Sequence, residues 1–217
     1  AVRDHLLREF PDHQFLGEEE CFGKAVETIR LPADAPPTWI VDPLDGTVNY
    51  VHDVPAYCVS IGLWMNGEPT VGVIYDPRMK ELFSAAQGQG AFRNDEPIRV
   101  SPCPTITGAL VSTGFPAEYE AQMRNLEAWR RVTRHTQALR RTGSTALNLA
   151  YVASGRFDGY WAYDNWPWDV LAGAVLVTEA GGRISTADGQ PFDPFRMDIC
   201  ATNGTIHDSL LSALHSE

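Results

Sequence analysis

A mixed α/β fold is predicted for this chain by three features of its sequence. Between residues 57 and 64, Val59, Ile61 and Leu63 recur at every second position, which is the period of a strand. Residues 118–141 carry apolar side chains at helical spacing, and residues 170–180 are apolar nearly all round ahead of two glycines. Strands and helices therefore share the chain, and periodicity by itself does not fix how they are layered.

The first half of the chain is predicted to form one sheet. Residues 38–41 (TWIV) make a short buried strand, because β-branched and aromatic residues run together ahead of Pro43, where we expect the chain to turn. Asn66-Gly67 favours a tight hairpin, so the strands on either side of it should pair antiparallel. The predicted strands are residues 38–41, 57–64, 70–75 and 82–86, continued by the glycine-rich residues 88–90.

The second half is predicted to hold a second sheet and four helices. Residues 108–113 and 158–163 are the expected strands. The longest helix follows Pro116, and its apolar residues from Tyr119 to Trp129 are spaced for one face. We interpret the arginines at its basic end as a solvated face with favourable helix-dipole placement. The alternative is that they help to draw in an anionic substrate. The predicted helices are residues 118–141, 144–154, 170–180 and 206–214.

Length and composition fit one compact domain. The 217 residues, 44% of them hydrophobic, can bury a core in a single unit of two packed halves, about 1–105 and 106–217. Seventeen basic against 28 acidic residues give a net charge of −11, which argues against a nucleic-acid surface. We see no apolar run long enough to cross a bilayer and no signal-peptide pattern, so no membrane partner is expected.

Four cysteines show no metal-ligand spacing and predict no disulfide framework. We interpret them as reduced and mostly buried, in a cytoplasmic protein. They are Cys21, Cys58, Cys103 and Cys200.

Asp42 and Asp45 follow the first predicted strand and form the most informative pair in the chain. The expected turn at Pro43 would bring Asp45 back beside Asp42, and Gly46 would allow close backbone approach. Two ionised carboxylates at one point repel each other, so a cation or a shared proton usually accompanies them. The alternative is an Asx turn, in which Asp45 bonds the backbone of Thr47 while Asp42 points to water.

Glu18 and Asp169 are two further acids that could join this pair. Glu18 lies in a run of three acids after Gly17, where a loop could carry one of them inward, although such a run by itself is a solvated charge cluster. Asp169 begins the apolar helix over 170–180, and capping is the common task of an aspartate in that place. The two tryptophans and the proline beside it indicate a constrained, partly buried acid instead.

Four motifs in order resemble the inositol monophosphatase family of magnesium-dependent phosphatases, and the resemblance spans nearly the whole chain. They are residues 17–19 (GEE), 39–50 (WIVDPLDGTVNY), 143–148 (GSTALN), and 168–173 (WDVLAG) running on to 179–182 (EAGG). The resemblance implies a layered αβαβα sandwich of the type that includes fructose-1,6-bisphosphatase. It also implies a homodimer and inhibition by Li⁺.

The resemblance assigns roles to single residues as well. It implies metal binding by four carboxylates and one main-chain carbonyl, which are those of Glu18, Asp42, Asp45, Asp169 and Leu44. It implies that Glu18, Thr47 and Asp45 are the catalytic residues, and that Glu18 and the Thr47 hydroxyl orient the attacking water. The substrate-binding set is Leu44, Asp45, Gly46, Thr47, Gly143, Ser144, Thr145 and Asp169, with the N–H groups of Gly46 and Thr47 on the phosphate.

Hard oxygen donors of this kind suit Mg²⁺ or Mn²⁺, and no clustered Cys/His set favours zinc. The resemblance implies two or three Mg²⁺ ions, with Mn²⁺ as a substitute. Phosphate-monoester hydrolysis is among the slowest uncatalysed reactions, so charge neutralisation and water activation must both be supplied. Two ions supply both, in an in-line displacement without a covalent intermediate.

The expected substrate is a small phosphate monoester, namely inositol monophosphate or a similar sugar or polyol phosphate. Many members of the family carry an acid that contacts sugar hydroxyls seven residues before the aspartate matching Asp169, whereas this chain has Ala162 there, with Asp164 close by. The alternatives are a 3′(2′),5′-bisphosphate nucleotidase, a histidinol-phosphate or fructose-1,6-bisphosphate phosphatase, or a weakly active metal-binding relative. Because relatives usually carry more residues before the motif with Glu18, we expect an upstream segment to be missing.

Two unrelated classes fail on spacing. Phosphatases that form an aspartyl-phosphate need a D-x-D spacing, but two residues separate Asp42 from Asp45. A calcium-binding loop requires acids at alternating positions and a closing glutamate, whereas Val48 and Tyr50 follow here. His52 stands alone and completes no Ser-His-Asp arrangement.

Overall fold

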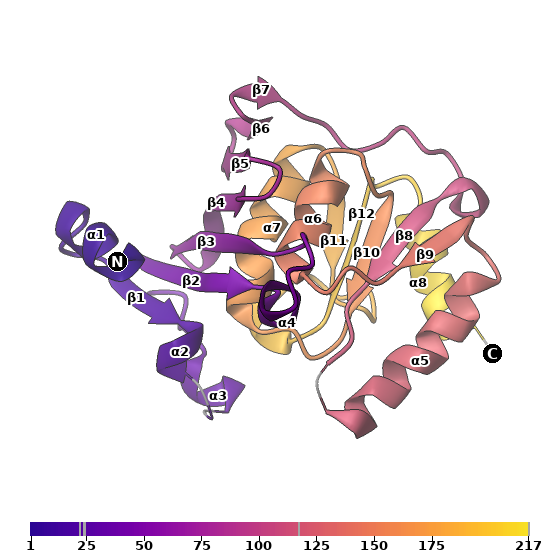
Figure 1. Cartoon of the computed structure of the whole chain (residues 1–217), viewed down its shortest axis with the longest axis horizontal. Helices are drawn as coiled ribbons and strands as arrows, with labels where there is room; N and C mark the ends of the chain where they lie inside the picture. The colour runs from indigo at the N-terminus through magenta and orange to yellow at the C-terminus, as the bar shows by residue number, and fades with distance from the viewer. Residues whose placement is uncertain (22, 24, 117, 217) are drawn as a thin grey trace.

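The computed structural model describes residues 1–217 except 22, 24, 117 and 217, and it arranges them in alternating layers (Figure 1). Helices α6 (Thr145–Ala153) and α7 (Pro167–Glu179) lie between a seven-stranded and a five-stranded sheet. Helices α5 (Tyr119–Thr133) and α8 (His207–His215) cover the outer face of the five-stranded sheet, and α1 (Val2–Glu9) packs on part of the outer face of the other. The predicted αβαβα sandwich is thereby confirmed.

The seven-stranded sheet follows chain order, and only its first pair of strands is parallel. The predicted hairpin is present between β3 and β4, where Asn66 and Gly67 both have positive φ, 57° and 81°. Glycine and asparagine tolerate that conformation, which the tight turn requires. The strands are β1 (Gln14–Gly17), β2 (Thr38–Asp45), β3 (Cys58–Met65), β4 (Glu68–Asp76), β5 (Glu81–Ala86), β6 (Gly90–Arg93) and β7 (Glu96–Pro97).

The five-stranded sheet has the order β11-β12-β10-β8-β9 and mixes parallel with antiparallel pairs. Its central strand β10 runs parallel to β8 and antiparallel to β12. The strands are β8 (Leu110–Thr113), β9 (Ala138–Arg140), β10 (Gly159–Ala162), β11 (Arg183–Ser185) and β12 (Ile199–Thr202). Three short helices, α2 (Glu18–Cys21), α3 (Val26–Ile29) and α4 (Thr47–Val51), and the 3₁₀ turns Ile106–Gly108 and Pro194–Arg196 complete the described elements.

Helix α7 lies close to the first sheet because glycines of the sheet face it. A Cβ atom at Gly72 would stand 2.2 Å from the carbonyl oxygen of Ala172, well inside van der Waals contact. On the other side of α7, Gly173 leaves room for Leu149 of α6, which a Cβ atom would approach to 2.4 Å. This close packing fixes the position of α7 and therefore of its N-terminus, where Asp169 lies.

The helix predicted over residues 118–141 is wrong at its C-terminal end. Helix α5 stops at Thr133, and residues 138–140 form strand β9 instead. Strand β9 pairs in parallel with β8, so that Leu139 lies opposite Val111. The backbone groups of residues 138–140 are satisfied by the neighbouring strand, which the helical spacing of the sequence does not reveal.

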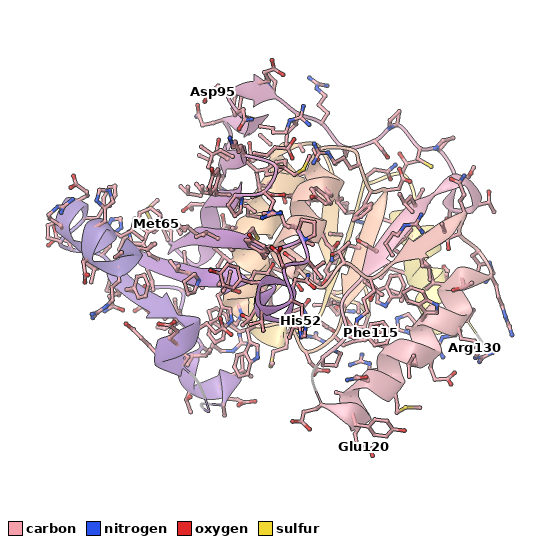
Figure 2. All side chains as sticks on the ribbon, viewed as in Figure 1. His52, Met65, Asp95, Phe115, Glu120 and Arg130 are labelled. Atoms are coloured by element: carbon pink, nitrogen blue, oxygen red, sulfur yellow. The ribbon has the colours of Figure 1, made fainter. Side chains whose placement is uncertain are left out.

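The apolar face predicted for this helix lies mostly on the solvent side, although its last member, Trp129, is half-buried. Tyr119, Met123 and Leu126 are exposed, whereas α5 buries Asn125 together with two small apolar residues, Ala128 and Val132. The burial of Asn125 has a physical cause, because its Oδ1 accepts a hydrogen bond of 2.9 Å from the indole N–H of Trp161 on β10. Figure 2 shows Glu120 and Arg130 projecting from α5 away from the sheets.

Elements before residue 30 were missed, because the sequence carries no clear period there. The segment around Glu18, expected to be a loop, is strand β1 followed by the short helix α2. The cysteines are free, and all except Cys103 are buried, as predicted. In the described part of the chain, no helix is both long and apolar enough to cross a bilayer.

Candidate metal centre

Asp42 and Asp45 lie on one continuous strand rather than on either side of a turn. Strand β2 runs on through Pro43 to Asp45, which corrects the predicted turn. Its pairing with β3 is interrupted between Asp42, opposite Ser60, and Asp45, opposite Cys58. Pro43 has no N–H to donate to a ladder, so the strand bulges at that point. The bulge brings both carboxylates to the same side, as the metal hypothesis requires.

The Asp45 carboxylate is held by the N-terminus of helix α6. Its Oδ2 accepts hydrogen bonds from Ser144 Oγ at 2.6 Å and from the N–H of Ala146 at 2.7 Å, and its Oδ1 accepts one from the N–H of Thr145 at 3.3 Å. A helix N-terminus favours a negative charge, because its first N–H groups lack partners within the helix. Asp45 is 8% exposed, so these donors replace much of its hydration.

Asp42 is buried, with an exposed fraction of 3%. Its Oδ1 accepts a hydrogen bond of 2.8 Å from the N–H of Leu44. An Asx-type contact is therefore present, but it is made by Asp42, which does not point to water. The alternative in which Asp45 bonds Thr47 is wrong.

Asp169 comes to the same place from helix α7. It is the third residue of that helix, and its Oδ2 accepts a hydrogen bond of 2.8 Å from the N–H of Trp166, the residue that caps the helix. Both sequence interpretations hold in part, because Asp169 supports the start of the helix and also faces the other two acids. The stacked rings of Trp166 and Trp168, 5.1 Å apart, restrict the chain around it.

Ligand atoms of three residues, Asp42, Asp45 and Asp169, lie within 4.8 Å of one another. Burial, followed by the charges of Asp45, Asp169 and Glu18, raises the pKa of Asp42 to about 9. Burial likewise raises the pKa values of Asp45 and Asp169. Without a cation Asp42 holds a proton near neutral pH, and burial disfavours the ionised forms of Asp45 and Asp169. A divalent cation would stabilise the ionised forms of all three. The donor set, all oxygen, fits Mg²⁺ or Mn²⁺.

Glu18 stands at the edge of this group. Its carboxyl shares a hydrogen bond with that of Asp42, and burial is the first cause that raises its pKa. Glu19 and Glu20 are exposed, so one acid of the run turns inward and the other two face solvent. Helix α2 begins at Glu18, directly after strand β1, and this position decides which acid turns inward.

The turn from β2 into α4 holds the residues predicted to contact phosphate. Gly46 has φ of 92°, and a Cβ atom there would stand 2.8 Å from the carbonyl oxygen of Ala56. The Thr47 hydroxyl donates a hydrogen bond of 3.0 Å to the carbonyl oxygen of Leu44. Leu44 and Thr47 are therefore tied together beside the two acids.

Ser144 and Thr145, two residues of the predicted substrate-binding set, contact Asp45, and Gly143 directly precedes them. Gly143 has φ of 89°, and its backbone packs against Asn49 of α4, whose Nδ2 donates to the carbonyl oxygens of Thr142 and Ala56 at 2.8 and 2.7 Å. Asn49 thus ties α4 to the segment before α6, a role that its presence in the motif did not reveal.

Tyr160 is a further residue that the sequence did not single out. Its hydroxyl lies 3.0 Å from Thr145 Oγ1, behind the acidic group. Burial raises its pKa, so it stays protonated. No pattern in the sequence marks this tyrosine, because it occupies an ordinary inward position of strand β10.

Ala162 and Asp164 differ in their surroundings. Ala162 is fully buried, and a Cβ atom at Gly114 would approach its Cβ to 3.5 Å. Asp164 is exposed with φ of 60°, consistent with a solvated loop acid, and His52 is exposed as well.

The structure combines a layered α/β sandwich with carboxylates clustered at a strand end and a helix N-terminus, a donor set that suits a divalent metal ion. The sequence profile described as the inositol monophosphatase family matches residues 1–217, and this chain belongs to that family. The chain is 44% identical to an inositol-1-monophosphatase of Synechocystis, over 98% of this chain and 72% of that protein.

Two further comparisons bear on structure and on substrate. An inositol monophosphatase from Anabaena superposes with a TM-score of 0.90 at 47% identity, over 98% of this chain and 82% of that one. A Thermotoga maritima protein named fructose-1,6-bisphosphatase/inositol-1-monophosphatase is 35% identical, over 99% of this chain and 78% of its own length. The family makes this chain a phosphatase, and the names of its relatives differ in substrate.

Proposed function

We propose that this protein hydrolyses a small phosphate monoester, inositol monophosphate or a similar sugar or polyol phosphate, in a reaction that depends on Mg²⁺. The observation that carries the proposal is the approach of Asp42, Asp45 and Asp169 to within 4.8 Å at their ligand atoms. Three carboxylates that close, two of them buried, form a strong site for a divalent cation.

Five groups would hold the ions, namely the carboxylates of Glu18, Asp42, Asp45 and Asp169 and the carbonyl of Leu44. The expected number is two or three Mg²⁺ ions, for which Mn²⁺ could substitute. When bound, such ions neutralise phosphate charge and lower the pKa of water. The proposal is supported by the raised pKa values of these acids, which a cation would reverse.

The protein's own groups would position the reactants. Glu18 and Thr47 would orient the attacking water, since a carboxylate and the Thr47 hydroxyl oxygen, whose own hydrogen is donated to the carbonyl oxygen of Leu44, can each accept one hydrogen of the water. The N–H groups of Gly46 and Thr47 would bind the phosphate oxygens. Asp45 is the rigid member of the group, because helix α6 fixes both of its oxygens. Gly143, Ser144 and Thr145 would line the substrate side, and Asp169 would lie near the leaving oxygen.

Further parts of the proposal follow from family membership and composition. A homodimer and inhibition by Li⁺ are expected from the family, and a cytoplasmic protein from its four free cysteines. The division of the domain near residue 105 stays a prediction. Phosphatases of related specificity, such as a bisphosphate nucleotidase or histidinol-phosphate phosphatase, are the alternatives that a substrate panel must separate.

Release of inorganic phosphate tests the proposal. Purified protein would be assayed with glycerol 2-phosphate, inositol 1-phosphate, fructose 1,6-bisphosphate and 3′-phosphoadenosine 5′-phosphate, with Mg²⁺ and with EDTA. We expect Mg²⁺-dependent turnover of at least one substrate, reduced by Li⁺. Equal rates with EDTA would contradict the metal assignment, and no turnover of any of them at saturating Mg²⁺ would contradict the enzyme itself.

A further inference from the structure

We infer that Arg141 selects substrates whose leaving group carries a second negative charge, such as a second phosphate or a carboxylate. This inference rests on the proposed function, because it concerns the pocket beside the same acidic centre. It predicts a preference for anionic phosphate monoesters over neutral polyol phosphates.

A cavity of about 420 Å³ lies next to the acidic centre. Ser144 and Thr145, which bond Asp45, form part of its wall, and Val48 and Asn49 of α4 form another part. A leaving group attached to a phosphate at the centre would therefore extend into this cavity. Its volume fits a small sugar or a three-carbon acid.

The cavity is free of carboxylates although the protein carries a net charge of −11. Arg141 is the charged residue among those that line it. Ala162 stands where many members of the family carry an acid that contacts sugar hydroxyls. It is fully buried next to Gly114 and offers no polar side-chain group. The cavity thus favours an anion and lacks an ionised acceptor for polyol hydroxyls.

Arg141 is held in place by an aromatic side chain. Its guanidinium carbon lies 4.9 Å from the ring centre of Phe115, and that ring lies 6.1 Å from the ring of Trp129 on α5. In the view of Figure 2, Phe115 lies between α4 and α5. This contact places the guanidinium over the ring and leaves its N–H groups free to donate.

Arg141 has no carboxylate partner among the described residues. Other arginines of the chain do pair, as Arg156 does with Glu81 at 2.6 Å. An unpaired guanidinium in the cavity wall is what a second anionic group would require.

The test compares kcat/KM for fructose 1,6-bisphosphate and glycerol 2-phosphate in three proteins. Arg141→Gln should reduce the ratio of the two constants at least about tenfold, the usual value of one charge-assisted hydrogen bond. Arg140→Gln is the matched control, because Arg140 is exposed like Arg141 but is not among the residues that line the cavity, and it donates to the carbonyl oxygen of Leu139. It should leave the ratio unchanged.

Charge reversal gives a second readout. Arg141→Glu should favour phosphoethanolamine, a monoester whose leaving group carries a positive charge, over glycerol 2-phosphate relative to the unaltered protein. Equal losses on both substrates in Arg141→Gln would mean that Arg141 binds the reacting phosphate or supports the fold, and would overturn the inference. An unchanged ratio would overturn it too.

Failure of the proposed function can be distinguished from failure of the inference about Arg141. If the unaltered protein hydrolyses neither substrate, calorimetric binding of fructose 1,6-bisphosphate still tests Arg141. A dissociation constant at least about tenfold weaker in Arg141→Gln, with no change in Arg140→Gln, supports the inference. Equal dissociation constants in all three proteins contradict it.

Discussion

Ser144 Oγ donates a hydrogen bond of 2.6 Å to Asp45 Oδ2, joining two residues 99 positions apart in the chain. The same hydroxyl oxygen accepts a hydrogen bond of 3.3 Å from the N–H of Leu147 and so caps helix α6. One side chain therefore starts a helix and fixes an acid of the candidate metal centre. Loss of that hydroxyl should affect folding and metal binding together.

Ser144→Ala is expected to destabilise the protein by about 1–3 kcal/mol, because a helix cap is lost and a buried carboxylate loses a donor. Denaturant unfolding in EDTA measures this. The control is Ser154→Ala at the other end of the same helix, where Oγ donates to the carbonyl oxygen of Ala150 and touches no acid. Similar losses for both variants would mean that the Asp45 contact contributes nothing.

Asp42→Asn should abolish Mg²⁺-dependent phosphate release while the protein remains folded. The substitution removes one charge from the centre of the acidic group and keeps the size of the side chain. In EDTA the variant should be at least as stable as the unaltered protein, because asparagine is neutral in the buried acidic group without first taking up a proton. Circular dichroism and phosphate release are the measurements, with the exposed Asp164→Asn as control. Normal turnover at saturating Mg²⁺ would remove Asp42 from the ligand set.

The metal-free protein should become less stable as the pH rises above neutral. Burial and neighbouring acids raise the pKa of Asp42 from 3.8 to about 9, so the folded state binds a proton that the unfolded chain releases near pH 4. The stabilisation is complete below pH 4 and is lost as the pH approaches 9. Thermal unfolding in EDTA from pH 6 to 9 measures this, and Asp42→Asn should flatten the profile. A profile just as steep in the variant would assign the effect to other groups.

His207 should make the protein sensitive to acid. Burial lowers its pKa from 6.5 to about 4, and its ring lies between Ser185 Oγ at 3.0 Å and Thr202 Oγ1 at 3.1 Å. Because the folded state disfavours the charged ring, its stabilisation is complete above pH 6.5 and is lost as the pH falls towards 4. The loss should approach about 3 kcal/mol, at about 1.4 kcal/mol for each pH unit.

Unfolding by urea between pH 7 and 4.5 measures that loss. His207→Gln should be less stable at pH 7 but should lose less on acidification. His215→Gln is the control, since His215 is exposed. If His207→Gln loses as much stability as the unaltered protein, the acid sensitivity lies in other groups.

Much of the fold could be predicted, because the turn residues and the spacing of apolar residues favour the same helices and strands that the structure contains. The β3–β4 hairpin follows from Asn66-Gly67, whose positive φ angles the tight turn requires, and α6 agrees with the helix predicted over residues 144–154. Strand β9 could not be predicted, because Ala138 and Leu139 suit a helix as well as a strand. The long-range pairing with β8 decides between them.

The sequence by itself determined the acids of the candidate centre and the family, because the motif patterns fix residue types at fixed spacings. Only the tertiary structure decided how those acids meet. A bulge turns Asp42 and Asp45 to one side, and glycine packing holds α7 where Asp169 faces them. The contact between Arg141 and Phe115 could not be predicted from the sequence either. Residues 26 positions apart become neighbours only when α5 and the strand after it fold back. Such contacts depend on the path of the whole chain, which no local pattern records.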